Sequence, residues 1–263
     1  MIVAVAKGAL EEAGRVWSFF YELVSETWAF LKGGRKSWKL DGRVILEQLE
    51  QIGSASVPVV LITALFTGMV LALQASITLE VKLKGVTQFI GRTVALPFIR
   101  ELGPVLTGLI VSGRIGSAIA AEIGTMAVTE QIDALKTLAT PPMRYLGVPR
   151  FLACVVMMPL LTAMACVVGL LGGYIVAGGL MGISALTYFG DIPEMVGVGD
   201  LVSGMGKTVF FGGIIAVISC YQGFNTTGGA EGVGHSTTKA VVWSSILILV
   251  SDYFLTTLFA LFV

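Results

Sequence analysis

Residues 100–150 read RELGPVLTGLIVSGRIGSAIAAEIGTMAVTEQIDALKTLATPPMRYLGVPR. The stretch opens with a charged pair inside an apolar span and leaves that span at Arg114. It continues as a polar, acid-bearing segment until Pro141-Pro142, and Arg150 precedes the next apolar run. A polar segment held between two membrane-length apolar stretches predicts a docking element on one membrane face.

The composition is that of an integral membrane protein. Of the 263 residues, 55% are hydrophobic and 13% charged, and the mean hydropathy is +0.88. A soluble domain carries about 25% charged residues. The formal net charge is zero, which favours no nucleic-acid partner, and the three cysteines lie in apolar spans without metal or disulfide spacing. The first thirty residues contain acids where a secretory signal would be apolar, so we expect the membrane spans to direct insertion.

The segment 8–31 alternates charged residues with aromatic and aliphatic ones at near-helical spacing. This pattern predicts an amphipathic helix lying in the membrane interface with its rings at headgroup level. A first transmembrane span is the alternative, and the acids Glu11, Glu22 and Glu26 weigh against it.

The whole chain, residues 1–263, is predicted to be a single all-α domain with five transmembrane helices. About 20 apolar residues cross the hydrocarbon core. Five stretches reach that length, namely 57–79, 88–113, 151–180, 201–222 and 240–263. The third is long enough to be tilted, or broken near Gly172-Gly173 or Gly178-Gly179.

The loops orient the spans. Most basic residues precede the first span, lie between the second and third, or precede the fifth, whereas the 181–200 loop has none. The positive-inside rule therefore places the N-terminus and 114–150 in the cytoplasm, and an odd number of spans places the C-terminus on the opposite side.

Three ionisable residues lie within or at the ends of spans: Arg100, Glu101 and Lys207. Such groups are costly in lipid and usually face a protein interior or a wet cavity. Adjacent residues on a helix point apart, so Arg100 and Glu101 need other partners, and Lys207 is a candidate for Glu101. Pro97 and Pro104 bracket the pair and favour a bent or broken helix.

A path for a lipid with an anionic phosphate is one interpretation of these charges. Arg100 and Lys207 would contact the phosphate and Glu101 would orient one of them. The apolar walls would come from Met69, Leu71, Leu73 and Leu79. The alternative is that the charges only anchor or brace helix ends. Gly206-Lys207-Thr208 lacks the earlier glycine and the strand of a P-loop, so any ATP hydrolysis would belong to a separate chain.

The segment 122–138 is predicted to be a short amphipathic helix in the cytoplasm. Ile132, Leu135 and Leu138 form an apolar stripe, and the acids around it are Glu122, Glu130 and Asp133. Such a helix commonly inserts into a groove of a partner protein. Lying flat on lipid is the alternative, which acids beside an anionic leaflet disfavour.

Four stretches in this order resemble the MlaE (YrbE-type) permease family. They are 100–104 (RELGP), 113–118 (GRIGSA), 122–135 and 228–242 (GGAEGVGHSTTKAVV). The resemblance covers nearly the whole chain beyond residue 40. His235 departs from it, because an arginine is expected there.

The resemblance implies a homodimeric permease of an ABC transporter in the inner membrane of a Gram-negative bacterium. It implies movement of glycerophospholipids and maintenance of outer-membrane lipid asymmetry. The implied partners are phospholipid, a cytoplasmic ATPase that carries ATP and Mg, a small STAS-domain protein and a periplasmic MCE-domain lipid carrier. No cofactor is expected on this chain.

Two other classes remain as alternatives. A stand-alone secondary carrier would use Arg100, Glu101 and Lys207 as a substrate or proton site, although no internal repeat is visible. A lipid-modifying membrane enzyme is the poorer alternative, because no His, Cys or Asp cluster with catalytic spacing occurs.

Overall fold

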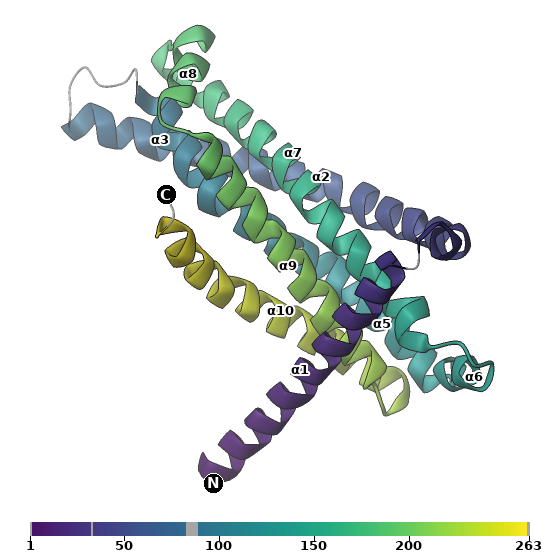
Figure 1. Ribbon diagram of the computed structural model, residues 1–263. Helices are drawn as coiled ribbons and strands as arrows, with labels where there is room; N and C mark the ends of the chain where they lie inside the picture. The colour runs from purple at the N-terminus through teal and green to yellow at the C-terminus, as the bar shows by residue number, and fades with distance from the viewer. Residues whose placement is uncertain (1, 33, 83–88, 262–263) are drawn as a thin grey trace. The chain divides into compact units, whose positions relative to one another are not determined.

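The computed structural model describes residues 2–32, 34–82 and 89–261, and in that part of the chain the regular structure is helical throughout. The elements in chain order (Figure 1) are α1 (Ile2–Lys32), α2 (Gly34–Lys82), α3 (Ile90–Pro97), η2 (Phe98–Leu102), α4 (Gly103–Val111), η3 (Ser112–Gly116), α5 (Ser117–Val128), α6 (Gln131–Thr137), η4 (Met143–Gly147), α7 (Val148–Met181), α8 (Ala185–Asp191), η5 (Ile192–Glu194), α9 (Val198–Phe224) and α10 (Gly229–Ala260). The short elements η2, η3 and η4 are π-helical turns, and η5 is a 3₁₀ turn.

The predicted all-α membrane class is confirmed. Within the described residues, 5 helical stretches are long and apolar enough to cross a membrane: Gly42–Thr78, Ile90–Val128, Met143–Met181, Val198–Phe224 and Gly229–Ala260. Each is longer than the span predicted from hydropathy, because helical hydrogen bonding continues into the polar residues beyond the apolar run.

The third of these stretches contains no break at its glycine pairs. α7 is one helix of 34 residues, and the chain leaves the helical direction at Gly182, where φ is +66°. Gly172 instead serves close packing, since a Cβ there would lie 2.3 Å from the carbonyl oxygen of Leu65 on α2. Close backbone approach of this kind is a common use of glycine in membrane helices.

Contacts within the chain define two units. The first comprises Met1–Ile52, Val111–Val156 and Gly212–Ile246, and the second comprises Gly53–Ile110, Met157–Phe211 and Leu247–Val263. The helices α2, α7, α9 and α10 contribute residues to both units.

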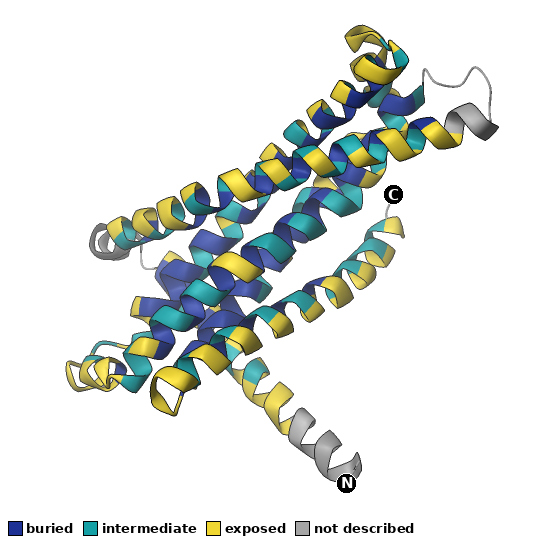
Figure 2. Ribbon diagram, turned by 180° about the vertical axis from the view of Figure 1, so that it is seen from behind, coloured by how far each residue is buried: buried dark blue, intermediate teal, exposed yellow. Residues whose placement is uncertain are grey.

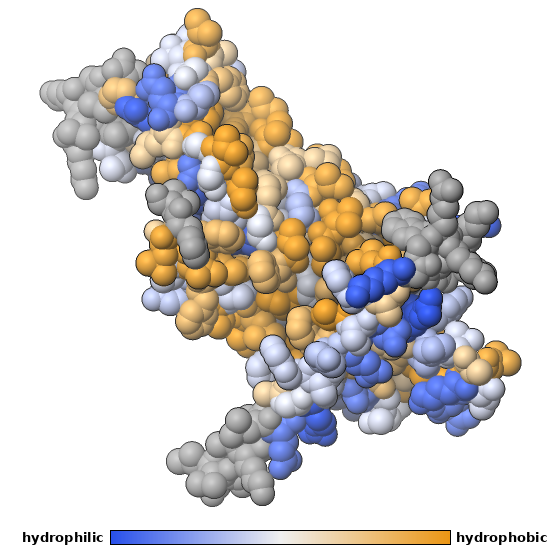
Figure 3. Space-filling model, viewed as in Figure 1, coloured by the Kyte–Doolittle hydropathy of each residue, from blue (hydrophilic) through white to orange (hydrophobic). Residues whose placement is uncertain are grey.

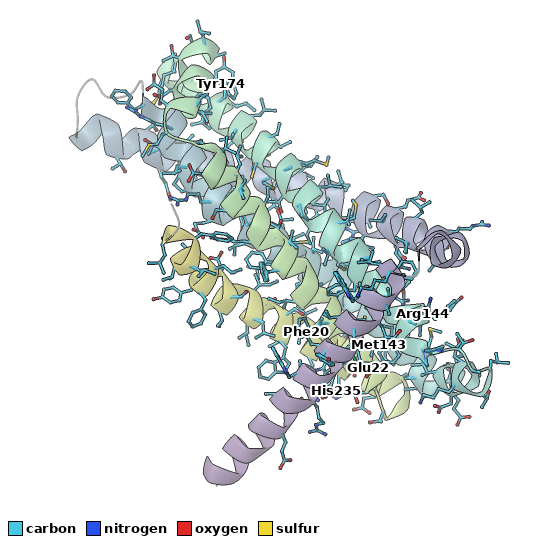
Figure 4. All side chains as sticks on the ribbon, in the orientation of Figure 1. Phe20, Glu22, Met143, Arg144, Tyr174 and His235 are labelled. Carbon is cyan, nitrogen blue, oxygen red and sulfur yellow. The ribbon has the colours of Figure 1, made fainter. Side chains whose placement is uncertain are left out.

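In the first unit, α1 packs along one face. Leu23 and Phe30 are buried with Met143, Val148 and Val217, and Figure 4 shows Met143 of η4 beside α1. The predicted helix at 8–31 is therefore present as part of α1.

Two further faces of α1 lie outside this core. Trp17, Tyr21 and Trp28 are exposed on one of these faces. The other carries Glu22 and Glu26, which belong neither to the buried core residues nor to the exposed aromatic ones. A helix with separate core, aromatic and charged faces suits a membrane interface, and that location stays a prediction.

In the second unit, a core forms around Tyr188 of α8. Tyr188 is fully buried with Ile90 and Val94 of α3 and Val176 of α7. A Cβ on Gly91 would lie 2.1 Å from the Tyr188 carbonyl oxygen, so only glycine lets α3 and α8 meet this closely.

α10 is the least covered of the membrane-length helices. Only 11% of its most apolar window is buried, against 56% for α9, and Figure 2 shows exposed residues along the helix that ends at the C-terminus. The uncovered apolar surface of α10 must face lipid or another protein chain.

Hydrophobic side chains dominate the surface along the membrane-length helices, whereas hydrophilic ones gather over α1 and α6 (Figure 3).

Candidate functional site

The π-helical turn η2 carries the charged pair that the sequence singled out. Pro104 has no N–H, so the carbonyl oxygen of Arg100, four residues earlier, lacks its α-helical donor. The ammonium group of Lys207 takes that place and donates to this oxygen over 3.1 Å. The sequence predicted a bent or broken helix between Pro97 and Pro104, and the structure has a π-helical turn within a continuous helical stretch, where the Arg100 carbonyl oxygen is free to accept from a buried lysine.

Lys207 is the centre of a cluster that joins η2, α9 and α10. Its side chain is 1% exposed, and Nζ lies 2.6 Å from Glu101 Oε2 and 3.1 Å from Asp252 Oδ1. It also lies 2.6 Å from the hydroxyl of Thr256. A buried ammonium is tolerated only when paired and hydrogen-bonded, and these partners provide both. We call Arg100, Glu101, Asp200, Lys207, Asp252 and Thr256 the charge cluster.

Gly204 brings α9 to η2. A Cβ on Gly204 would lie 2.4 Å from the carbonyl oxygen of Ile99, so the two backbones are in contact at this point. Lys207 follows one turn later on the same helix and therefore meets Glu101.

Arg100 points to a different partner. Its Nε lies 3.1 Å from Asp200 Oδ1, and Asp200 Oδ2 accepts a hydrogen bond from the Gly197 N–H at the start of α9. The Arg100 side chain remains 32% exposed. With all groups ionised, Arg100 and Lys207 are outnumbered by the carboxylates of Glu101, Asp200 and Asp252, so the charge cluster has a formal charge of about −1.

The residues predicted to form a lipid path do not form one group. The predicted partnership of Glu101 and Lys207 is confirmed, but Lys207 is buried and paired, so in this structure it is unavailable to a phosphate. Met69 and Leu71 pack against the Tyr188 core instead. Leu73 is 41% exposed, and the side chain of Leu79 lies outside the described residues.

The predicted single helix over 122–138 is wrong. α5 ends at Val128 and α6 begins at Gln131, because Glu130 adopts the left-handed conformation with φ 61°. Thr129 reinforces the turn, since its hydroxyl and its N–H both donate to the Thr125 carbonyl oxygen, over 2.7 and 3.1 Å. We call residues 125–134 the elbow.

The predicted docking residues separate between the two helices. On α6, Ile132 is buried in the chain's own fold, Leu135 is partly buried, and Leu138, which follows it, is 74% exposed. Glu130 and Asp133 are exposed, and Asp133 pairs with Lys136 over 2.8 Å. The exposed surface of α6 therefore carries the Asp133–Lys136 pair, with Glu130 just before the helix and the projecting Leu138 just after it, and Ile132 does not belong to it.

Glu122 belongs to another site. It lies on α5, where Oε2 accepts from Arg150 over 2.9 Å and Oε1 accepts from Gln51 over 3.1 Å. Arg150 is 7% exposed, whereas the Glu122 side chain is 41% exposed, so the enclosed member of this pair is the arginine.

Sequence reasoning missed Asp200, Asp252, Thr256 and the role of Arg150. Asp252 had a usable signal, because it is a lone acid inside the apolar run 240–263. His235 is exposed on α10, 3.9 Å from Glu231.

Long apolar helices and a buried charge cluster within them define a multi-pass helical membrane protein. Residues 45–258 match the family described as permease MlaE. A probable ABC transporter permease of Rickettsia typhi is 46% identical over 220 residues, 82% of each chain. One of Synechocystis is 44% identical over 217 residues, also 82% of each. The chloroplastic protein TRIGALACTOSYLDIACYLGLYCEROL 1 of Arabidopsis thaliana is 42% identical over 221 residues, 84% of this chain and 63% of that protein.

The chain belongs to the MlaE permease family and is an ABC transporter permease, a transport subunit. This assignment excludes the stand-alone carrier and implies an ATPase partner.

Proposed function

We propose that this chain is the permease of a transporter that moves glycerophospholipids between its membrane and a periplasmic MCE-type carrier, and so maintains outer-membrane lipid asymmetry. The observation that carries the proposal is the 42% identity to an Arabidopsis protein named for trigalactosyldiacylglycerol, because that glycolipid shares the diacylglycerol body of a phospholipid. The transporter works in the inner membrane with the N-terminus cytoplasmic. A STAS-domain protein completes the assembly.

The proposed assembly is a homodimer. Support comes from α10, whose most apolar window is 11% buried and which carries exposed Trp243, Tyr253 and Phe254. A membrane helix this uncovered has surface for a second copy as well as for acyl chains.

The proposed ATPase contact is the exposed face of α6, with Leu138 entering a groove and Glu130 and Asp133 facing basic residues on its rim. A short helix presenting one apolar anchor among acids suits a groove of that chemistry. At the charge cluster, Arg100 is the residue we assign to the lipid phosphate, because a third of its side chain is exposed.

Reconstitution tests the proposal. The chain, copurified with its ATPase, is placed in vesicles with a fluorescent phospholipid, and lipid transfer to an added acceptor is followed with ATP and with a non-hydrolysable analogue. ATP-dependent transfer of phospholipid, reduced by Arg100→Ala, is expected. ATP hydrolysis without transfer of any phospholipid would contradict the substrate assignment.

A further inference from the structure

Arg150 is an enclosed cation near the start of α7, and its surroundings do not fully satisfy it. One terminal nitrogen donates to the Leu146 carbonyl oxygen over 3.1 Å, and the other donates to Glu122 Oε2 over 2.9 Å. Its Nε is buried and has no hydrogen-bond partner among the described residues. An orphaned donor in a buried guanidinium calls for a physical explanation.

Glu122 links three helices through its two oxygens. Oε2 binds Arg150 of α7, and Oε1 accepts from the amide of Gln51 on α2, while Glu122 itself lies on α5. These contacts join positions 71 and 28 residues apart in the chain. Without the Glu122 carboxylate, Arg150 and Gln51 both lose their hydrogen-bond partner on α5.

The elbow connects Glu122 firmly to α6. The Thr129 hydroxyl closes the last turn of α5, and the Ala134 N–H donates to the Glu130 carbonyl oxygen over 3.0 Å, which starts α6. Ile132 is buried and holds α6 against its own unit. A displacement of α6 is therefore passed to α5 and so to Glu122.

The orphaned Nε indicates a second arrangement. Arginine binds carboxylates best through two parallel N–H···O bonds, and Nε with one terminal nitrogen forms such a fork. The oxygen that Nε would use, Oε1, is held by Gln51. A carboxylate oxygen has two acceptor sites, so Oε1 can accept from Nε while it holds Gln51, and a small shift of α5 would bring the two atoms within reach.

We propose that Glu122, Arg150 and Gln51 form a clasp of positioning residues that makes α2, α5 and α7 move together when the ATPase displaces α6. The clasp rests on the proposed docking of the ATPase at α6. It transmits motion without touching lipid or nucleotide.

Glu122→Gln tests the clasp, because it keeps the side-chain length and an oxygen for Gln51 but removes the charge that faces Arg150. Spin labels at Leu46→Cys on α2 and Val156→Cys on α7, both exposed positions, report the separation of these helices. The three native cysteines are replaced by alanine, and labelled chain is diluted into unlabelled chain so that only distances within one chain are measured. The complete transporter is examined without nucleotide and with ATP plus vanadate.

The intact clasp is expected to give one narrow separation in both nucleotide states. In Glu122→Gln the distribution with ATP plus vanadate broadens, and the lipid moved per ATP hydrolysed falls about fivefold or more, the lower end of typical coupling strengths. Glu47→Gln is the matched control, because it makes the same change in the exposed Arg43–Glu47 pair of α2. It should behave as the parent protein in both measurements.

Gln51→Met provides the second variant in case Glu122→Gln does not assemble, since Gln51 is exposed and its loss leaves no buried charge. It should show the same broadening to a smaller extent. A narrow separation with parental coupling in Glu122→Gln overturns the clasp, as does parental behaviour of Gln51→Met when Glu122→Gln is degraded. Parent protein that keeps the narrow separation but moves no phospholipid contradicts the proposed substrate alone.

Discussion

At the scale of single residues, Lys207 connects three elements. It lies on α9 and binds groups of η2 and α10. Its 1% exposure means that loss of its charge leaves Glu101 and Asp252 facing each other without a cation. For Lys207, this arrangement supports the alternative in which the charges stabilise the helices and do not contact lipid.

Lys207→Met is expected to lower the free energy of unfolding in detergent by about 3–5 kcal/mol, the usual cost of breaking a buried ion pair from one side. Lys136→Met removes a lysine from an exposed pair and should cost less than about 1 kcal/mol. Equal unfolding curves for the two variants would contradict the buried role of Lys207.

Tyr188 lies outside the membrane-length helices, and burial raises the pKa of its phenol from the ordinary 10 to about 12. Its hydroxyl has no hydrogen-bond partner among the described residues. Because the folded pKa exceeds the unfolded one, the associated stability is complete below pH 10 and is lost as the pH rises towards 12.

At pH 11 the parent protein should have lost about 1.4 kcal/mol of its free energy of unfolding through this phenol. Tyr188→Phe should not show that loss. Denaturant unfolding at pH 8 and pH 11 measures it as the difference between the parent protein and the variant. Tyr253→Phe, which changes a tyrosine that is 69% exposed, is the matched control variant. A parental pH dependence in Tyr188→Phe would show that another group is responsible.

At the scale of elements, glycine contacts decide how closely the helices pack. Gly204 and Gly206 are two residues apart on α9, yet a Cβ on Gly204 would meet the Ile99 carbonyl at 2.4 Å and one on Gly206 would meet only the Phe259 ring at 3.4 Å. The first neighbour is backbone and cannot turn aside, whereas the second is a side chain.

Gly204→Ala should accordingly destabilise the protein by about 1–3 kcal/mol, the range for overpacking, and loosen the Lys207 contacts. Gly206→Ala places the same methyl group on the same helix at little cost. Thermal unfolding of both variants decides the point, and equal transition temperatures would argue against backbone contact at Gly204.

The elbow and α6 form the second element with a testable role. Leu138→Asp is expected to leave the protein inserted and folded but to abolish copurification of the ATPase, because a charge buried in an apolar groove costs several kcal/mol. Leu186→Asp changes a leucine on α8 that is 87% exposed, and the ATPase should copurify with this variant normally. Retention of the ATPase by Leu138→Asp would remove α6 as the docking element.

At the scale of the whole molecule, the topology follows from charge bias and from an odd number of spans. Single cysteines at Thr140 and Leu186, in a chain lacking the native three, should react differently with a membrane-impermeant thiol reagent. Leu186→Cys should label in intact cells stripped of their outer membrane, and Thr140→Cys only after permeabilisation. The reverse pattern would invert the topology.

The sequence by itself determined the membrane class and the number of long apolar helices, and it offered Lys207 as a candidate partner for Glu101. Hydropathy is a sum of local properties over about 20 residues, so it predicts a membrane span without knowledge of how the helices pack. The irregularity between Pro97 and Pro104 has an equally local cause, because Pro104 lacks the N–H that would bond the carbonyl oxygen four residues earlier.

Only the tertiary structure decided which acids complete the charge cluster, where the polar helix breaks and which face of α6 is free. Asp252 reaches Lys207 because α10 packs near η2, and Glu122 lies on α5, where it pairs with Arg150, 28 residues later, and not on α6. These choices depend on how side chains from distant helices meet to within a few tenths of an ångström, which no local pattern encodes.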